Sequence, residues 1–349
     1  MKSRLICLVI GLFHLVEAQR TPLIDSVCQA VQRQRLECQV HRVETADGYL
    51  LSVHRIPAPR NPACPRQLRP FLLMHGLLGS AADFVSGGAG RSLALELHAR
   101  CFDVWLGNAR GTTHSHSHRS LSPSDARFWQ FSWHEIGVYD LPATVDYVLA
   151  RTGRQQLHYV GHSQGTTVLL VLLSQRPEYN ARFADAALMA PVAFLKHLSS
   201  PPLRLLASDS SAVTNILPRI LETTPAGISR RQLQHFGQLI NSGNFQQFDY
   251  RSARINTLRY GQATPPSYQL ANVRLQLQIF HGSRDVLSSP VDVQRLGREL
   301  RHSSTQLYQV SGYNHIDFLF AVTAPQLVYQ RIIQQAWQLD AVSVALPGG

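Results

Sequence analysis

The stretch Gly161-His162-Ser163-Gln164-Gly165 lies between an apolar run at residues 157–160 and a helix-prone run at residues 166–174. The first run predicts a buried strand and the second a helix, so the five residues form a sharp turn with a serine at its apex. Gly161 and Gly165 lack a Cβ atom, which lets the strand and the helix pass close to each other. Roughly 0.1 such matches arise by chance in a chain of this composition, so the neighbouring elements have to support the prediction.

Strands and helices alternate along most of the chain. The predicted strands are a hairpin at 40–43 and 49–56, then 71–74, 102–106, 157–160, 186–189, 275–280 and 306–310; the predicted helices are 91–98, 141–150, 166–174, 291–300 and 324–339. This alternation is typical of an α/β fold with a mostly parallel sheet and helices on both faces.

The alternation stops between residues 192 and 271, where only helical pieces at 203–206, 216–221 and 233–240 are predicted. An insertion between core elements indicates a helical cap over one edge of the sheet. We therefore divide the chain into a signal peptide at 1–18, a first core part at 19–191, the cap at 192–271, a second core part at 272–340 and a loose tail at 341–349.

The N-terminal residues have the pattern of a secretory signal peptide. Lys2 and Arg4 precede an apolar stretch at 5–16, and Val16-Glu17-Ala18 fits a small-residue cleavage site. An uncleaved anchor is disfavoured because this stretch is shorter than the ~20 residues that span a bilayer. We expect a secreted, extracellular protein with no transmembrane segment in the mature chain. The lack of an Asn-x-Ser/Thr sequon disfavours glycan-dependent sorting to lysosomes.

Export to an oxidising compartment makes disulfides the expected state of the cysteines that follow the signal peptide. These are Cys28, Cys38, Cys64 and Cys101, and four cysteines allow three pairings. Two structural disulfides are plausible, although the spacing leaves the connectivity open. A zinc site is disfavoured because no C-x-x-C spacing occurs, and we expect neither a metal nor a cofactor.

The charge of the chain is strongly basic, with a formal net charge of +11 at pH 7. A basic surface attracts anionic lipid interfaces or nucleic acid. The arginines are scattered, however, and no basic helix or nucleic-acid motif occurs, so we expect a solvated surface and no nucleic-acid partner.

A serine at a strand-to-helix turn needs an acid and a histidine to become a nucleophile, and in the α/β-hydrolase fold these follow it in the order acid, histidine. Asp285 comes directly after the strand at 275–280. The competing carboxylates are placed before a strand, within the cap or at a helix start that capping explains; they are Asp185, Asp209, Asp249 and Asp292. Asp285 is therefore the predicted acid.

The predicted histidine is His315, in the loop that leaves the last strand, whereas His302 falls in a polar stretch before that strand. His315 would take the proton of Ser163, and Asp285 would fix the imidazole tautomer and stabilise the cation. The predicted oxyanion hole consists of the backbone N–H groups of Leu77, in the loop after the strand at 71–74, and Gln164.

With these segments in place, the chain resembles the acid lipase family of the α/β-hydrolase fold, which includes gastric lipase, lysosomal acid lipase and secreted insect lipases. The resemblance covers residues 38–337 and rests on motifs at 45–49, 75–79, 103–111, 139–143, 161–165 and 313–318. It implies the nucleophile at Ser163, the acid at Asp285, the histidine at His315 and the oxyanion donors at Leu77 and Gln164.

Two departures from the resembling family concern the cap and one loop position. Similar lipases carry a longer insert with a cysteine-containing lid, but this chain has no cysteine after Cys101. His134 stands where relatives usually have an aspartate, and we expect no direct catalytic effect there. The short cap predicts a more open site, because an apolar lid normally shields the acyl-binding groove.

Other polar residues have plainer interpretations. The run Thr113-His114-Ser115-His116-Ser117-His118 could ligate a metal, yet alternate histidines on an exposed loop are more often solvated. Asn108, Arg110 and Asp317 are predicted to anchor loops near the site rather than to take part in chemistry.

Three functions fit these patterns. The leading one is a secreted serine lipase that hydrolyses acyl esters of neutral lipids of the triacylglycerol type at a lipid interface, through an acyl-enzyme. The alternatives are a carboxylesterase for smaller soluble esters, which the short cap favours, and a lipid-binding or storage protein without catalysis. The complete set of Ser163, Asp285 and His315 disfavours the last one.

Overall fold

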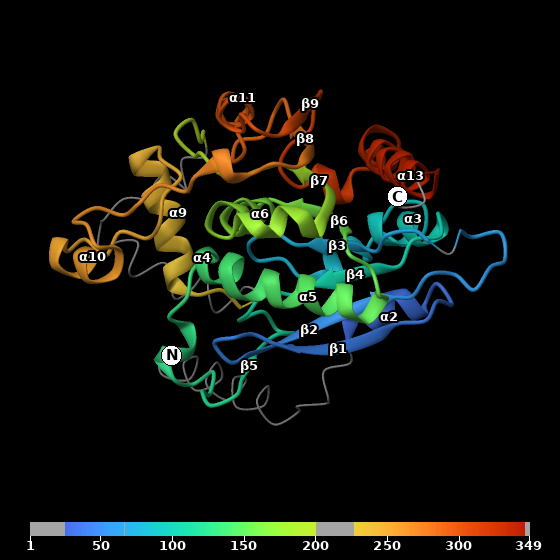
Figure 1. Ribbon diagram of the computed structural model, residues 1–349, viewed down its shortest axis with the longest axis horizontal. Coiled ribbons are helices and arrows are strands. Elements are labelled where there is room, and N and C mark those ends of the chain that lie inside the picture. The colour runs from blue at the N-terminus through green and yellow to red at the C-terminus, as the bar shows by residue number, and fades with distance from the viewer. Residues whose placement is uncertain (1–24, 66, 200–226, 346–349) are drawn as a thin grey trace, which may run out of the picture.

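The computed structural model describes residues 25–65, 67–199 and 227–345. The predicted signal peptide, the predicted cap helices at 203–206 and 216–221, and Asp209 lie outside the described residues. Figure 1 shows the chain with α9 and α10 at the left of the molecule and α3 and α13 at the right.

The sheet has nine strands in the order β1-β2-β4-β3-β6-β7-β8-β9, with β5 paired to β2. The strands are β1 Gln39–Glu44, β2 Tyr49–Ile56, β3 Phe71–Met74, β4 Val104–Gly107, β5 Ser117–His118, β6 Leu157–His162, β7 Phe183–Met189, β8 Gln276–Gly282 and β9 Ser304–Val310. The strands from β4 to β9 on the main path run parallel, and β1 and β2 are antiparallel. The predicted mostly parallel α/β sheet is confirmed.

Helices cover both faces of this sheet. The α-helices are α2 Ser26–Gln32, α3 Leu93–Ala99, α4 Trp133–Glu135, α5 Leu141–Thr152, α6 Gln164–Gln175, α9 Arg230–Ser242, α10 Ala253–Tyr260, α11 Pro290–Glu299, α12 Asp317–Phe320 and α13 Gln330–Ala345. Short 3₁₀ or π turns occur at η1 Ala81–Phe84, η2 Ala126–Trp129, η3 Ile136–Asp140, η4 Pro177–Arg182, η5 Leu270–Asn272 and η6 Pro325–Tyr329.

The alternation of side chains along the central strands explains the two layers of helices. In β3, Leu72 and Met74 belong to one buried cluster, which includes α5 and α6, while Phe71 and Leu73 belong to the other, which includes α3 and α13. Successive residues of a strand point to opposite faces, so a strand that is apolar at every position has to be covered on both sides.

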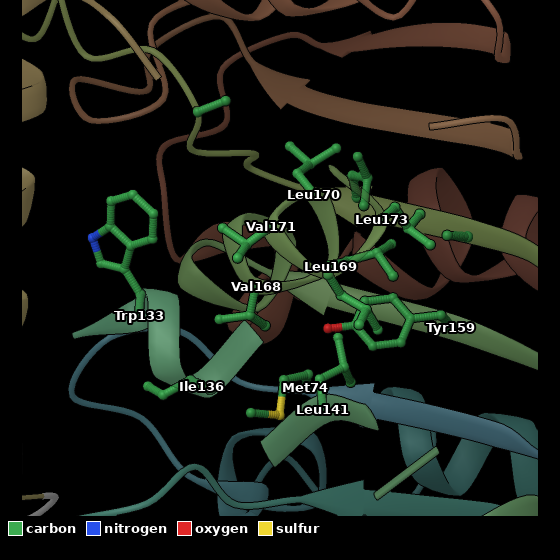
Figure 2. Packing of buried hydrophobic residues seen from close by; sticks show 14 of the residues in the cluster. Met74, Trp133, Ile136, Leu141, Tyr159, Val168, Leu169, Leu170, Val171 and Leu173 are labelled. Carbon is green, nitrogen blue, oxygen red and sulfur yellow. The ribbon is translucent and has the colours of Figure 1, made fainter. Parts of the chain in front are cut away.

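Helix α6 is the most deeply buried helix near the centre of the molecule, and every residue from Gln164 to Ser174 is buried. Figure 2 shows Trp133, Ile136 and Leu141 packing around its side chains. At Gly137 of η3 a Cβ atom would lie 2.7 Å from Val171 Cγ1, so only glycine lets η3 approach α6 this closely. Because α6 is held on all sides, the turn that precedes it has a fixed position.

Several predicted boundaries were wrong. β7 begins at Phe183, so Asp185 lies inside the strand and not before it. Helix α13 continues to Ala345, into the segment predicted to be a loose tail. Helix α10 was not predicted because it lacks an apolar stripe, and its Leu258 is 77% exposed.

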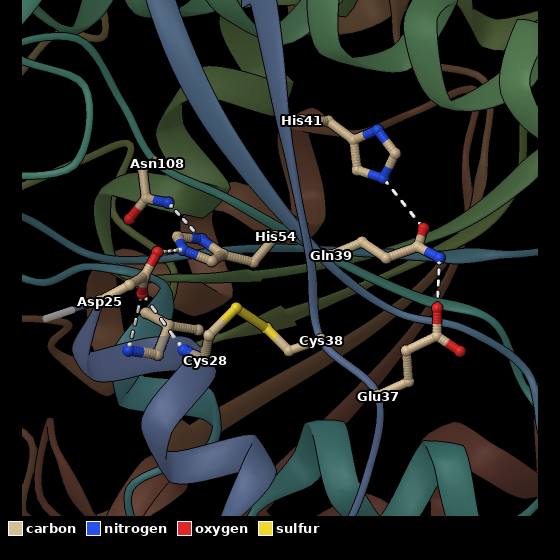
Figure 3. Close-up of a disulfide and its surroundings, with 9 residues drawn as sticks. Asp25, Cys28, Glu37, Cys38, Gln39, His41, His54 and Asn108 are labelled. Carbon is tan, nitrogen blue, oxygen red and sulfur yellow. Dashed lines mark hydrogen bonds and ion pairs between the residues drawn. A yellow bond between two sulfur atoms is a disulfide. The ribbon is translucent and has the colours of Figure 1, made fainter.

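Two disulfides join the N-terminal elements to the core. Cys28 of α2 is bonded to Cys38 at the start of β1, and Cys64 is bonded to Cys101 at the end of α3. Figure 3 shows the first of these. The expectation of two disulfides is therefore met, and the pairing that the spacing left open is sequential. Across the described ranges, we find no helix with the length and apolarity needed to cross a bilayer.

Candidate active site

Ser163 lies at the apex of a strained turn between β6 and α6. Its backbone has φ 51° and ψ −117°, a region that residues other than glycine rarely adopt. A Cβ atom on Gly161 would lie 2.6 Å from the carbonyl carbon of Gly165, and one on Gly165 would lie 2.2 Å from the carbonyl oxygen of Met74. Gly161 is therefore required for β6 and α6 to pass each other, as the sequence predicted, whereas Gly165 is required for α6 to pass the end of the neighbouring strand β3.

The structure brings Ser163, His315 and Asp285 into one hydrogen-bonded chain. The Oγ atom of Ser163 lies 2.7 Å from Nε2 of His315, and Nδ1 of His315 lies 2.9 Å from Oδ2 of Asp285. These distances fit an Nδ1–H donated to the carboxylate and a serine hydroxyl donated to Nε2. The three residues follow β6, β8 and β9, whose carboxyl ends meet at one edge of the sheet.

Asp285 is held as an ionised acceptor. Its Oδ1 accepts hydrogen bonds from the backbone N–H groups of Leu287 and Ser288, each at 2.8 Å. Burial raises the pKa of this carboxyl, but the hydrogen bond and charge interaction with His315, together with the two backbone donors, outweigh burial and lower it below its usual value. The carboxylate is thus available to orient the imidazole of His315.

The loop that carries His315 is fixed by its neighbours. The backbone N–H of Asn314 donates to Asp317 at 2.7 Å, which agrees with the predicted anchoring role of Asp317. Nε2 of His162 lies 2.8 Å from the backbone carbonyl oxygen of His315 and donates to it. Burial, and then the nearby His315, lower the pKa of His162 to about 3, so this ring remains neutral and acts as a donor.

The loop after β3 presents its backbone toward the same edge. Nδ1 of His75 donates to the carbonyl oxygen of Gly76 at 2.7 Å, and Nε2 accepts the N–H of Ala109 at 3.1 Å. Because a trans peptide holds its C=O and N–H on opposite sides, the N–H of Leu77 points away from His75. Burial lowers the pKa of His75 to about 4, which keeps this arrangement neutral.

Gln164 is the first residue of α6, and its side chain contacts a helix from the predicted cap segment. Its Oε1 accepts a hydrogen bond from Nε2 of Gln232 in α9 at 3.1 Å. Among the described residues, none accepts a hydrogen bond from the backbone N–H of Leu77 or of Gln164. Both groups are therefore free to bind an oxygen atom of a ligand.

The triad opens into an apolar cavity of about 440 Å³. Ser163 and His315 line it together with Leu77, and the wall facing them includes residues of the predicted cap segment. The apolar lining residues are Leu77, Leu78, Val192, Leu195, Leu198, Leu233, Phe236, Ile240, Leu287, Ile316, Leu319 and Phe320. Pockets of this size accommodate drug-sized or lipid-chain ligands, and this lining favours an aliphatic one.

The histidine-rich loop does contribute to a group of potential metal ligands. Asp25, His54 and His114 place one ligand atom each within 4.8 Å of one another. Asn108, however, donates to Ser52 O at 2.8 Å and accepts the N–H of Ala81 at 3.0 Å, so its remaining N–H faces Nδ1 of His54 at 3.1 Å. The proton of His54 must then lie on Nε2.

That tautomer explains the group without an ion. Nε2–H of His54 donates to Asp25 at 2.7 Å, as Figure 3 shows. A metal bound at Nε2 would need the proton on Nδ1, where it would meet the N–H of Asn108. The hydrogen bonds therefore link the segment before α2 to the loop after β4, which agrees with the predicted anchoring role of Asn108.

Arg110 is a second buried anchor of the loop after β4. Its guanidinium contacts Asp47 at 2.5 Å and Asp140 at 2.5 Å and lies 3.9 Å above the ring centre of Tyr49. These contacts tie the hairpin, the loop and η3 together, and they leave no donor of Arg110 directed at the triad.

One prediction about a rejected carboxylate needs correction. Asp292 does not cap α11, whose N-cap is Ser289; its carboxylate accepts the backbone N–H and Nδ1–H of His197 at 2.8 Å each. Asp83 and His162 line the cavity but were not predicted. His162 lies inside the quoted turn, and Asp83 ends a Ser-x-x-Asp capping box, a pattern that indicates a helical turn but not a place in the cavity.

The fold and the residues at its edge define a carboxylic ester hydrolase of the α/β-hydrolase fold. The model of the α/β-hydrolase fold family matches residues 69–242, and the model of the partial α/β-hydrolase lipase region matches residues 27–88. A soluble variant of monoglyceride lipase from Saccharomyces cerevisiae has a similar fold, with a TM-score of 0.59 and 16% identity over 87% of this chain and 96% of that one.

Relatives at higher identity narrow the class. Lipase 1 of Drosophila melanogaster is 35% identical over 88% of this chain and 79% of its own length. Lipase 3 of the same organism is 35% identical over 94% of this chain and 96% of its own. Gastric triacylglycerol lipase of Bos taurus is 34% identical over 88% and 90%, respectively. The chain therefore belongs to the acid lipase family of carboxylic ester hydrolases.

Proposed function

We propose that this protein is a secreted serine lipase that hydrolyses acyl esters of neutral lipids of the triacylglycerol type. The observation that carries the proposal is the chain from Ser163 through His315 to Asp285, with distances of 2.7 and 2.9 Å, at the floor of an apolar cavity of about 440 Å³. The names of the gastric lipase relatives support the substrate class.

Acylation begins when His315 takes the proton of Ser163 and Oγ attacks the ester carbonyl carbon. The carbonyl oxygen becomes an oxyanion, for which the backbone N–H groups of Leu77 and Gln164 are the proposed donors. The protonated His315 then gives its proton to the departing alcohol oxygen as the C–O bond breaks, and Asp285 stabilises the cation in the meantime.

Deacylation repeats these steps with water. His315 takes a proton from water, the hydroxide oxygen attacks the acyl-enzyme, and the same two N–H groups hold the second oxyanion. Ser163 leaves with the proton that His315 returns, which releases the fatty acid. The cap at 192–271, which we propose as an inserted subdomain, supplies Leu195, Phe236 and other apolar side chains for the acyl chain.

The rim of the cavity supports action at a lipid interface. Leu78, Ile316 and Phe320 line the cavity and are 37%, 55% and 50% exposed, respectively. Large apolar side chains exposed together beside a ligand cavity favour contact with a lipid surface. The net charge of +11 would add attraction to anionic lipids. Two disulfides and the signal-peptide pattern support secretion.

A panel of esters tests the proposal. Purified protein is given emulsified triolein and dissolved p-nitrophenyl butyrate across pH 4–9, with Ser163→Ala as the matched control. We expect hydrolysis of both esters by the wild type, and a fall of about 10⁴-fold or more in kcat for Ser163→Ala. The dissolved p-nitrophenyl ester releases p-nitrophenolate and reports the chemical step without a lipid interface.

The outcomes separate the competing functions. Turnover of the dissolved ester alone would replace the lipase proposal with a carboxylesterase. Binding of triolein without turnover of either ester would favour a lipid-binding protein. Equal rates for the wild type and Ser163→Ala would refute the proposed nucleophile.

A further inference from the structure

One carboxyl group interrupts the apolar wall of the active-site cavity. Asp83 lies in η1, shortly after the loop that carries Leu77, and it lines the cavity together with Ser163 and His315. Among the described residues that line this cavity, it is the only acid. Asp83 is the N3 residue of the capping box that Ser80 begins, which accounts for one hydrogen bond of its carboxyl group, and the chemistry of the triad does not use it.

Asp83 and Ser163 lie at the two ends of one tight turn. The turn at residues 76–79 is closed by a hydrogen bond of 3.2 Å from the N–H of Gly79 to the carbonyl oxygen of Gly76. A Cβ atom on Gly76 would lie 3.0 Å from Cβ of Ser163, and one on Gly79 would lie 2.1 Å from Oδ2 of Asp83. The lack of a side chain at Gly79 therefore makes room for the carboxyl group beside the site of attack.

The carboxyl group of Asp83 has spare hydrogen-bonding capacity. Its Oδ2 accepts the backbone N–H of Ser80 at 3.3 Å, and the described residues supply it with no second donor and no basic partner. A carboxylate offers about four acceptor positions. Burial raises the pKa of Asp83 to about 6, which reflects the same shortage of stabilising partners.

The ligand that suits this wall must satisfy the carboxyl group as well as the apolar residues. An aliphatic chain alone would cover an incompletely bonded carboxyl and leave its remaining acceptor positions without a partner. A hydroxyl group on the ligand would donate a direct hydrogen bond to one of them. A partial acylglycerol has both parts, an acyl chain for the apolar wall and a free hydroxyl close to the ester bond.

We propose that Asp83 determines specificity by accepting a hydrogen bond from a free hydroxyl group of the substrate, so that partial acylglycerols, which form when a triacylglycerol loses its first acyl chain, are cleaved faster than esters without a hydroxyl. This inference rests on the proposed ester hydrolase function. Asp83 acts in substrate binding and takes no part in bond cleavage.

Two dissolved esters with the same acyl group test the inference without an interface. Glycerol monobutyrate carries free hydroxyls, whereas ethyl butyrate has none. The measured quantity is the ratio of their kcat/KM values. We expect the wild-type ratio to exceed that of Asp83→Leu by about tenfold, the effect of one lost hydrogen bond to a charged group. Asp83→Asn keeps a neutral acceptor and should give a ratio between those of the wild type and Asp83→Leu.

Ser80→Ala is the matched control for the local structure. It removes the hydroxyl that accepts the N–H of Ala82 at 3.2 Å, the other half of the same cap, and leaves the carboxyl of Asp83 in place. We expect its ratio to equal that of the wild type. A fall in the Ser80→Ala ratio as large as that of Asp83→Leu would overturn the inference, because the effect would then act through the loop.

A second measurement needs no variant. Inhibition of wild-type ethyl butyrate hydrolysis is compared for 1-O-butylglycerol and its di-O-methyl ether, which lacks hydroxyl donors. We expect an inhibition constant about tenfold lower for the free diol. Equal constants, or equal ester ratios for the wild type and Asp83→Leu, would overturn the role of Asp83 while hydrolysis of both esters still supports the proposed function. Failure to hydrolyse either ester would instead overturn the function itself.

Discussion

His158 and His162 belong to the same strand, β6, and both are buried, yet their surroundings give them opposite charge states. His162 is at the carboxyl end, where it donates to a neutral carbonyl oxygen and burial lowers its pKa to about 3. His158 is at the amino end, between Asp185 at 2.6 Å and Asp340 at 3.2 Å. Burial lowers its pKa, but the two carboxylates outweigh burial and raise it to about 9.

The difference in charge state between the two histidines reflects a different role for each end of the sheet. At the amino end, His158, Asp185, Asp340 and Arg69 form a buried charged cluster that joins β6 and β7 to α13. At the carboxyl end, neutral histidines hold the loops around Ser163. Because these histidines are neutral, they add no positive charge that would compete with His315 for Asp285.

The largest expected effect comes from a substitution in the triad at the carboxyl end of the sheet. Asp285→Asn should lower kcat/KM for p-nitrophenyl butyrate by about 10⁴-fold, because an amide favours the wrong tautomer of His315. The midpoint of thermal unfolding should shift only slightly compared with an amino-end variant. A loss of less than tenfold would mean that Asp285 is not the acid partner.

A substitution in the charged cluster at the amino end of the sheet should instead change the stability of the fold. Asp185→Asn leaves a buried imidazolium with one partner fewer, and we expect the free energy of unfolding to fall by about 3 kcal/mol. Activity per folded molecule should stay near the wild-type value. Urea unfolding followed by circular dichroism measures the change, and Glu178→Gln, at an exposed ion pair, is the control with an effect within about 0.5 kcal/mol. Equal losses for the two variants would contradict the account.

The two histidines should also give opposite pH dependences of stability. The folded-state pKa of His158 is raised, so its contribution is complete below pH 6.5 and is lost as pH rises toward 9. The folded-state pKa of His162 is lowered, so its contribution is complete above pH 6.5 and is lost as pH falls toward 3.

Difference curves between wild type and variant measure these contributions. The wild-type advantage over His158→Gln should shrink by on the order of 3 kcal/mol between pH 6.5 and 9. The advantage over His162→Asn should shrink in the other direction, below pH 6.5. If the two stability differences changed with pH in the same direction, the hydrogen-bond partners of His158 and His162 would not set the charge states of these histidines.

The carboxyl end could be predicted from the sequence because each reacting residue follows a strand directly. Apolar runs locate β6, β8 and β9, and the chain order of Ser163, Asp285 and His315 then excludes most other candidates. Gly161 and Gly165 also marked the turn, and in the structure a Cβ atom at either position would clash with backbone atoms. Local chemistry and local spacing were sufficient there.

The amino end and the cavity wall could not be predicted in this way. His158 and Asp340 are separated by 182 positions, and Asp340 falls just after the helix predicted at 324–339, where no sequence pattern indicates its partner. Asp185 was misplaced because β7 begins at Phe183, three residues before the apolar run at 186–189. Asp83 reaches the cavity only because Gly79 leaves space for it, a relation between two residues that no periodicity records.

The central claim is that Ser163 is a nucleophile activated by His315 and Asp285 in an ester-binding cavity. Incubation with a p-nitrophenyl alkylphosphonate, followed by peptide mass spectrometry, tests it most directly, because attack on phosphorus leaves a stable adduct on the attacking oxygen. The account predicts one phosphonyl group per molecule on Ser163, and at least a hundredfold slower labelling in His315→Ala. Labelling at another residue, or equal rates in the two proteins, would contradict it.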